Sequence, residues 1–564
     1  MREWLEETHG PGFELLRHFL LRFFDSDLVT ASGQTSTALI GAFSILLPWY
    51  PMIVGPLRHK YAYFSGLPSA GPYRMAVRAD ELWLITLVMS ATGLLTAIKW
   101  QSLFPGLRDY RVLGPLPLKT RQIFAAKLLA LLIVATAAVV TLNLFPGTMF
   151  PAVSSGRWAF LPSVGTRISA YLIASTAGSY FLFFALTALQ GVLLNLLPPR
   201  QFGRVTGTLQ GLLVGVMLIL VVLSFSIQPE VTRLLVQPDF ARWLPPVWFL
   251  GLCQRLSGDP DPAMSLLAGR ALTGLAVAIV VVLASYMASY RRHRTLLVEG
   301  AAPSRRHWRW PGLVFDRLMP DARQQAITIF IARTLAGSSQ HRMILMGYGG
   351  FGIAILLSGL IGMRDFVKPD HVVAARFVYA HVILLIFLLI GVRHLFSIPI
   401  ELKANWAFQI TEREGRRRWL YAVDRFVLFT GATVMLVLPL PLEIYLLRWR
   451  TAAEMAMFTA VALLSYEMIF ATWEKLPFTC SHLPGKTPAW ILTLQFVGLL
   501  TLLPMVNGIL LESLYRPILY LVVMAIVVAV WANTHATRRD DWGELRLKYE
   551  ESPDPAVHGL NLMR

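Results

Sequence analysis

The residues that could do chemistry are thinly spread, and none of their patterns completes a catalytic motif. Segment 347–352 matches Gly-x-Gly-x-x-Gly, but it lies in an apolar run, whereas a dinucleotide site needs a preceding strand. Gly485-Lys486-Thr487 resembles the end of a phosphate-binding loop, yet Cys480 stands where the loop's first glycine is required. The sequence contains no HExxH, CxxC or GxSxG motif. We therefore predict that the chain is not an enzyme and holds no cofactor or metal.

Polar side chains inside apolar runs are more informative, because burying them in a bilayer is costly. For a lone histidine such as His381 we expect a polar contact rather than a role as a ligand. The other polar residues form hydrogen bonds between helices or line a translocation path, and the sequence leaves both readings open. The candidates for such a path are Glu467, Gln190, Asn195, Gln495 and Asn507.

The elements that carry these residues are long apolar runs. The chain has 564 residues, of which 55% are hydrophobic and 15% charged, whereas soluble domains average about 25% charged. This composition and the two cysteines exclude a soluble enzyme, a coiled coil, a disordered chain and a disulfide scaffold. We predict an all-α polytopic integral membrane protein with about 12 transmembrane helices of about 20 residues each. The runs are 35–56, 81–98, 123–145, 168–195, 208–227, 264–288, 343–362, 376–396, 425–447, 452–473, 488–511 and 515–534.

The positive charge has a simple topological explanation. The net charge is +18, which would suit a nucleic-acid partner in a soluble protein. In a polytopic protein, however, Lys and Arg accumulate in cytoplasmic loops. With a cytoplasmic N-terminus, the inner loops hold about two Lys or Arg for each one outside. We therefore predict a multi-pass protein of the inner or plasma membrane, with both termini cytoplasmic, contacts to the lipid bilayer and no nucleic-acid partner.

The spans fall into two halves that begin alike. Before the first span, Leu16, Phe19 and Leu20 share one face of an amphipathic helix at 13–25 that lies in the membrane plane. A shorter apolar stripe of Ile327 and Ile331 precedes the seventh span. The predicted domains are a first six-span half at 1–290, a basic cytoplasmic linker at 291–322, a second six-span half at 323–535 and a cytoplasmic tail at 536–564.

The loops after the second span of each half extend this likeness. Each loop runs from a proline, Pro105 or Pro399, through a basic and aromatic cluster into the next span. Ile123-Phe124-Ala125 in the first half corresponds to Leu420-Tyr421-Ala422 in the second, at an offset of 297 residues. An in-plane helix followed by six spans, occurring twice, indicates an internal repeat.

The segment from Leu116 to Lys127, LPLKTRQIFAAK, resembles the cytoplasmic loop after the second span of type-2 ABC transporter permeases. Segments 399–412 and 476–486 are similar to long, duplicated bacterial members of that group. The resemblance implies six spans per half, an in-plane N-terminal helix and a re-entrant segment before the last span. The loop at 240–255 fits such a segment in the first half. The last outer loop, 512–514, is too short for one in the second.

The resemblance also implies a function and a partner. Such permeases are membrane subunits of ATP-driven exporters, and the expected partner is a separate cytoplasmic ABC-type ATPase in two copies. The in-plane helix and the loop after the second span would rest on that ATPase. The implied coupling residues are Arg17, Arg22, Arg108, Asp109, Lys119 and Arg121 in the first half, and Glu401, Lys403, Asn405 and Arg416 in the second.

Two other functions remain open at this stage. A secondary transporter can also have two six-span halves, but the Asp-Arg-x-Gly-Arg loop typical of the major facilitators is absent between spans 2 and 3. A membrane-embedded lipid or sugar transferase would need an acidic or histidine cluster at one membrane face. No such cluster is visible in the sequence.

Overall fold

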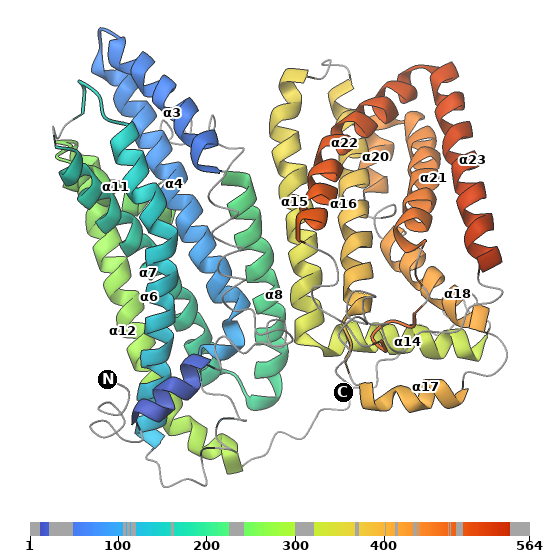
Figure 1. Cartoon of the computed structure of the whole chain (residues 1–564), viewed down its shortest axis with the longest axis horizontal. Coiled ribbons are helices and arrows are strands. Elements are labelled where there is room, and N and C mark those ends of the chain that lie inside the picture. Colours follow the sequence, from blue (N-terminus) through green and yellow to red (C-terminus); the bar gives the residue numbers. More distant parts are fainter. Residues whose placement is uncertain are drawn as a thin grey trace, which may run out of the picture. The chain divides into compact units, whose positions relative to one another are not determined.

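The chain divides into two compact units, Met1–Ser304 and Arg305–Arg564. A computed structural model describes residues 12–21, 49–104, 109, 113, 120–159, 163–224, 242–298, 321–366, 371–400, 402–411, 416–432, 437, 439–471, 473, 475–480 and 489–541, some of them by their backbone alone. These residues are helical with short connections, and no strand occurs among them. The all-helical class predicted from the sequence is confirmed for the described residues (Figure 1).

Unit 1 is a bundle of long helices. A short helix covers residues 12–21. The bundle then consists of α3 (Trp49–Gly66), α4 (Ala70–Ile98), α6 (Thr120–Val153), α7 (Val164–Leu196), α8 (Pro199–Ser224), α11 (Pro245–Leu256) and α12 (Pro262–Val298). Helix α7 packs against α12, α6, α4 and α11, so it runs through the middle of the unit. Aromatic rings fill the core near one end, where Tyr61, Phe150 and Tyr171 are buried against each other.

Ion pairs fasten this end of unit 1. The Lys60 amine lies 2.8 Å from a carboxylate oxygen of buried Asp80, which also accepts a 2.6 Å hydrogen bond from the Tyr61 hydroxyl. Arg78 pairs with Asp259 in the turn between α11 and α12. These contacts join α3, α4 and the α11–α12 turn. They are buried or half-buried, where a paired charge is far less costly than a single one.

Helix α11 is too short to be a span. It has 12 residues, or about 18 Å at 1.5 Å per residue, against a hydrocarbon core of about 30 Å. Gly258, with φ 81°, ends it in a conformation that favours glycine, and the chain returns as α12 packed along α11. The length and the reversal are those of the re-entrant segment expected near 240–255.

Unit 2 has a second bundle standing on a layer of short helices. The bundle comprises α15 (Ser339–Phe366), α16 (Val372–Ser397), α20 (Leu440–Leu447), α21 (Arg450–Phe470), α22 (Ala489–Tyr515) and α23 (Pro517–Asp541). At its lower end in Figure 1 lie α14 (Ala322–Gly337), η3 (Leu402–Asn405), α17 (Trp406–Thr411) and α18 (Arg416–Val427). Helix α14 crosses the end of the bundle, as expected for an in-plane helix, and α17 lies beneath it (Figure 1).

The long helices have the composition and surface of membrane spans. Nine helices in the described part of the chain are long and apolar enough to cross a bilayer. Several carry large apolar side chains on the outside, including Leu266 at 73% and Ile518 at 79% exposure. Such surfaces are costly in water and suit contact with lipid. The chain is therefore a multi-pass helical membrane protein, and the number of 12 spans stays a prediction.

Three boundaries differ from those expected. The predicted span 425–447 is not one regular α-helix among the described residues, because α18 ends at Val427, a π-helical turn covers Leu428–Ala432, and α20 begins at Leu440; residues 433–436 and 438 lie outside the described residues. Pro439 and Pro441 flank this restart and cannot donate backbone hydrogen bonds. Helix α12 continues to Val298, so the first residues of the expected linker at 291–322 are helical. The predicted span 35–56 lies largely outside the described residues, and α3 extends beyond it to Gly66.

Candidate docking faces and a buried ion-pair network

The base of unit 1 is built by the helix at 12–21 on the first turns of α6. Leu15 and Phe19, one turn apart, are buried in a cluster with Leu113, Ile123 and Ala126. The Lys127 amine lies 5.0 Å from the centroid of the Phe19 ring, in a cation–π contact. The helix is thus packed against the loop and the span that follow α4. Of the predicted loop after the second span, Leu113 thus packs with this helix, and most of that loop lies outside the described residues.

The opposite face of that helix is charged and exposed. Arg17 lies 3.6 Å from Glu14, and both side chains are about half exposed. Arg121 is also exposed, at the start of α6. Asp109 is buried, so its carboxylate faces the protein interior and not a soluble partner. The remaining coupling candidates of the first half, Arg22, Arg108 and Lys119, lie outside the described residues.

Unit 2 repeats the same packing. Ile327 and Ile331 of α14, again one turn apart, are buried in a cluster with Leu420 and Val423 of α18. Leu420 and Val423 correspond to Ile123 and Ala126 at the 297-residue offset found in the sequence. Both units therefore dock an in-plane helix against equivalent positions of the segment after their second span.

Helix α17 stands on this layer and presents apolar side chains outward. The Phe408 ring packs on Phe330 of α14 at 5.2 Å between centroids, and on Trp419 of α18 at 6.2 Å. Trp406 and Ile410, one turn apart on the other side, are 63% and 67% exposed. An amphipathic helix held from one side by aromatic rings presents its other side to lipid or to a protein partner.

The coupling candidates of the second half surround α17. Asn405 immediately precedes it and is buried, with its side-chain amide donating to the carbonyl of Thr479. Segment 476–480 is itself held by Phe478, whose amide donates to Phe396. Lys403 and Arg416 lie in η3 and at the start of α18, where the structure describes only the backbone. Glu401 lies outside the described residues.

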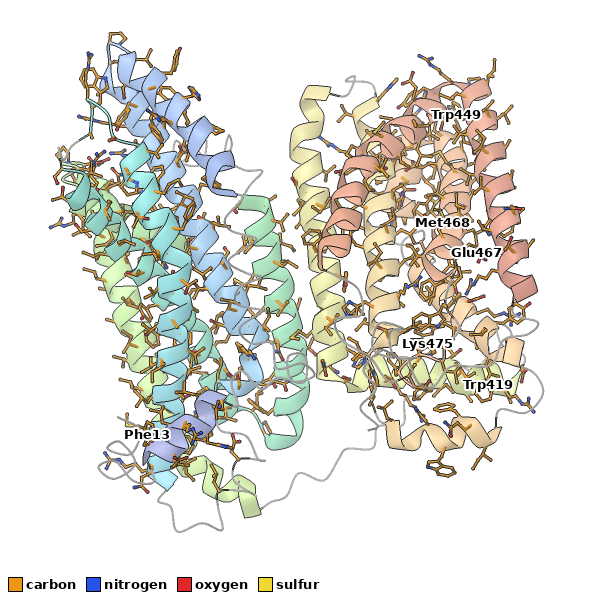
Figure 2. The ribbon with its side chains drawn as sticks, viewed as in Figure 1. Phe13, Trp419, Trp449, Glu467, Met468 and Lys475 are labelled. Carbon is orange, nitrogen blue, oxygen red and sulfur yellow. The ribbon has the colours of Figure 1, made fainter. Side chains whose placement is uncertain are left out.

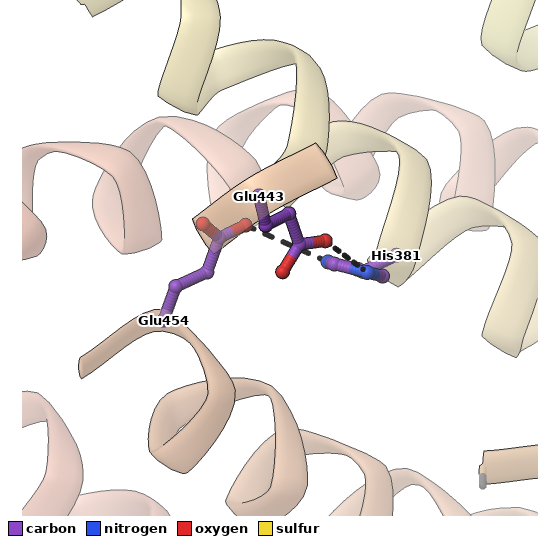
Figure 3. Close-up of side chains that lie close together, drawn as sticks. All are labelled: His381, Glu443 and Glu454. Atoms are coloured by element: carbon purple, nitrogen blue, oxygen red, sulfur yellow. Dashed lines mark ion pairs between the residues drawn. The ribbon is translucent and has the colours of Figure 1, made fainter. Parts of the chain in front are cut away.

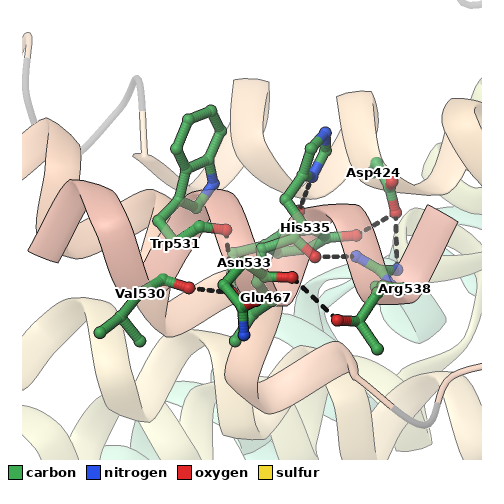
Figure 4. Close-up of polar contacts among 10 residues, drawn as sticks. Asp424, Glu467, Val530, Trp531, Asn533, His535 and Arg538 are labelled. Carbon is green, nitrogen blue, oxygen red and sulfur yellow. Dashed lines mark hydrogen bonds and ion pairs between the residues drawn. The ribbon is translucent and has the colours of Figure 1, made fainter.

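A network of buried charges joins three helices near the same end of unit 2 (Figure 4). Arg538 of α23 donates to Glu467 of α21 at 2.9 Å and to Asp424 of α18 at 3.0 Å. His535 contacts the other oxygen of Glu467, and the Tyr466 hydroxyl donates to Asp424. The guanidinium and a protonated imidazole would balance the two carboxylates. Glu467 was singled out from the sequence, but its partners were not.

A cavity of about 370 Å³ borders this network. Its lining includes Asp424, Glu467 and His535 together with Gln324 of α14 and Trp531 of α23. Burial raises the pKa of the Asp424 carboxyl, and the Arg538 guanidinium acts in the opposite direction. Glu467 thus forms an ion pair with Arg538 and also lines this cavity.

The other path candidates behave differently from Glu467. Asn195 of α7 donates to the carbonyls of Gly191 and Ser285 and to the Ser289 hydroxyl, so it joins α7 to α12. Gln190 of α7 and Asn507 of α22 are buried. The Gln190 side-chain oxygen and both polar atoms of the Asn507 side-chain amide have no hydrogen-bond partner among the described residues. The side chain of Gln495 in α22 is not described. Two of the five candidates lie in unit 1 and three in unit 2.

Fold and site together define a helical multi-pass membrane protein with a repeated base layer and buried polar clusters. No family model, curated protein or solved structure matches the chain.

Proposed function

We propose that the chain is the permease subunit of an ATP-driven, ABC-type exporter and works with two copies of a separate cytoplasmic ATPase. The proposal rests on the resemblance described above and on the repeated base layers. A permease without its own nucleotide site needs a surface on which an ATPase can push. That surface must be tied firmly to the helices that it moves.

The observation that carries the proposal is helix α17. It lies in the loop after the second span of unit 2, where the resemblance implies coupling residues. Phe408 fastens it to α14 and α18, and Trp406 and Ile410 face outward. Exposed aromatic and apolar side chains on a rigid support are typical anchors of a protein interface. The charged face of helix 12–21, with Arg17, gives unit 1 its corresponding surface.

The test begins with the full chain purified in mild detergent from the membranes of its own host. An ATPase with Walker motifs is expected to co-purify with it. The double variant Trp406→Ala, Ile410→Ala should then bind the ATPase about 30-fold more weakly, because loss of a central aromatic anchor commonly costs about 2 kcal/mol or more. The ratio of the two proteins is measured by quantitative mass spectrometry.

The matched control is Tyr445→Ala, Trp449→Ala, which removes two well-exposed rings. Trp449 lies at the end of unit 2 opposite α17 (Figure 2). This control should keep the wild-type ratio. If the wild-type chain carries no ATPase, the proposed function is wrong. If both double variants lose it equally, α17 is not the docking element.

A secondary transporter is the second candidate, and one observation favours it. Glu467 and His535 are ionisable, in mutual contact, and line the cavity of about 370 Å³. Acidic and histidine side chains in membrane segments commonly mark ion or proton pathways. This candidate gains support if the chain purifies without an ATPase and Glu467→Gln abolishes function in cells.

A further inference from the structure

Three ionisable side chains meet inside unit 2, away from the network around Arg538 (Figure 3). They are His381 of α16, Glu443 of α20 and Glu454 of α21, with exposed fractions of 4%, 0% and 1%. The His381 Nε2 atom lies 3.0 Å from Glu443 Oε1, and Nδ1 lies 3.5 Å from Glu454 Oε1. Each of the three side chains can offer one nitrogen or oxygen atom as a metal ligand, and these three atoms lie within 4.8 Å of one another.

The polar atoms of this group are poorly satisfied. Neither ring nitrogen of His381 and none of the four carboxylate oxygens makes a hydrogen bond of normal geometry to any residue that the structure describes. Buried polar atoms are nearly always hydrogen-bonded, so six such atoms in one place point to a missing ligand. Two carboxylates with a neutral imidazole also carry a charge of −2, which is costly to bury without a counter-ion.

The backbone holds the two carboxylates in place. A two-residue turn joins α20 to α21, and its first residue, Arg448, has φ 54°, a conformation that L-residues rarely adopt. The Thr451 hydroxyl donates to the carbonyl of Glu443 at 3.0 Å and so ties the two helices together. Strained backbone of this kind persists where the surrounding structure fixes it, commonly at ligand sites. The Phe458 ring packs against His381 at 4.6 Å between centroids and leaves the imidazole little freedom to turn away.

We propose that His381, Glu443 and Glu454 form a binding site for one divalent transition-metal cation such as Zn²⁺. One imidazole nitrogen and carboxylate oxygens are suitable ligands for Zn²⁺ at about 2.0–2.2 Å. Tetrahedral bonds of that length place ligand atoms about 3.4 Å apart. The 3.0 Å between His381 Nε2 and Glu443 Oε1 is close to this separation, and one ligand atom of each of the three residues lies within 4.8 Å of the others. A dication also neutralises the two carboxylates. A cavity of about 10 Å³ beside His381 and Glu454 has room for about one water molecule or ion.

The site does not depend on the proposed exporter function. It joins α16 to the α20–α21 hairpin, so a bound cation would clamp three helices of unit 2. The site could not be predicted from the sequence, because His381 is separated from Glu443 and Glu454 by about 60 or more residues and was expected to make only a polar contact.

The test measures metal in the full-length chain. Chelator-washed protein in detergent is dialysed against Zn²⁺, and its metal content is determined by plasma mass spectrometry. About one equivalent per chain is expected for the wild type. His381→Gln and Glu454→Gln should weaken binding at least about 100-fold, since even partners outside the metal's own ligands cost about 10–100-fold.

Two variants serve as matched controls. His341→Gln removes another buried histidine of unit 2, and Glu512→Gln removes a carboxylate of α22. Both should keep one equivalent of Zn²⁺. A wild-type chain without bound Zn²⁺ would overturn the proposal, and so would unchanged binding in His381→Gln and Glu454→Gln.

A second measurement needs no variant, in case these substitutions prevent folding. X-ray absorption of the Zn²⁺-loaded wild type should show nitrogen and oxygen ligands at about 2.0–2.2 Å with a single imidazole. Sulfur at about 2.3 Å or two or more imidazoles would mean that the metal sits elsewhere.

Discussion

At the scale of single residues, the sequence could identify Glu467 but not its surroundings. An ionisable residue within an apolar run stands out in any sequence, because burial in the membrane is costly. Its partners could not be predicted in the same way. Arg538 lies 71 residues from Glu467 and 114 from Asp424, so the network exists only once α18, α21 and α23 have packed together. The contact among His381, Glu443 and Glu454 was not predicted for the same reason, because it forms only when α16 packs against α20 and α21.

Arg538 is the residue whose loss should damage this network most. Arg538→Gln leaves Asp424 and Glu467 buried without their shared cation, and breaking a buried pair costs about 3–5 kcal/mol. We expect a clear drop in the thermal unfolding midpoint of the purified chain, followed by intrinsic fluorescence. The control Arg516→Gln breaks an exposed pair with Glu512, worth about 0.2–1 kcal/mol. Equal midpoints for the two variants would contradict a stabilising role for Arg538.

At the scale of elements, the helices at 12–21 and in α14 were well predicted because their apolar spacing is plain in the sequence, and their place in the membrane plane stays a prediction. The Leu15–Phe19 and Ile327–Ile331 pairs share one period, and both are buried against the segment predicted to correspond. The π-helical turn between α18 and α20 was not predicted. Hydropathy does not distinguish an apolar run that forms one continuous helix from a run that forms an interrupted one. Pro439 and Pro441 were the signs of an interruption in this run.

The docking of helix 12–21 can be tested through its one fully buried ring. Phe19→Ala should cost about 3–5 kcal/mol, the usual loss for a buried Phe. Because the helix is held mainly by this side, it should detach locally, and its amides should exchange with deuterium on the order of 100-fold faster. Leu21→Ala on the same helix removes a side chain that is 57% exposed and should leave exchange unchanged. Exchange that is equally slow in both variants would show that Phe19 does not hold the helix.

At the scale of the whole molecule, composition alone predicted a helical membrane protein, and the described helices confirm that class. Orientation remains a prediction from the distribution of Lys and Arg. It can be checked on unit 2, where Trp449 lies at the end opposite α17 (Figure 2). Both native cysteines are buried, so introduced cysteines should be labelled with little background.

With cytoplasmic termini, Trp449→Cys should react with a membrane-impermeant maleimide in intact cells, and Ile410→Cys should react only after the cells are opened. Both side chains are well exposed, so accessibility within the protein does not limit either reaction. Labelling is measured as the mass-shifted fraction of the chain. The reverse pattern would invert the predicted topology.

The absence of a convincing nucleotide motif in the sequence leads to one further prediction. Purified chain that has been stripped of co-purifying proteins should hydrolyse no ATP above the rate of a detergent blank. The measurement is phosphate release, with the unstripped preparation as the positive control. Hydrolysis that persists after stripping and rises in proportion to the chain would exclude the permease proposal.

The π-helical turn of unit 2 also has a mechanical consequence. In unit 1, the corresponding segment α6 is one helix of 34 residues, about 51 Å long at 1.5 Å per residue. Its two internal prolines, Pro146 and Pro151, lie in its last third, so a displacement at its base, where helix 12–21 docks, travels along an uninterrupted helix as far as Phe145. In unit 2 the corresponding helix changes to a π-helical turn after Val427, and π-helical turns are places where helices bend. The helix of unit 1 is thus uninterrupted from its base to Pro146, whereas the corresponding helix of unit 2 becomes π-helical directly after Val427, so equal displacements at the two bases would produce unequal movements further along the two helices.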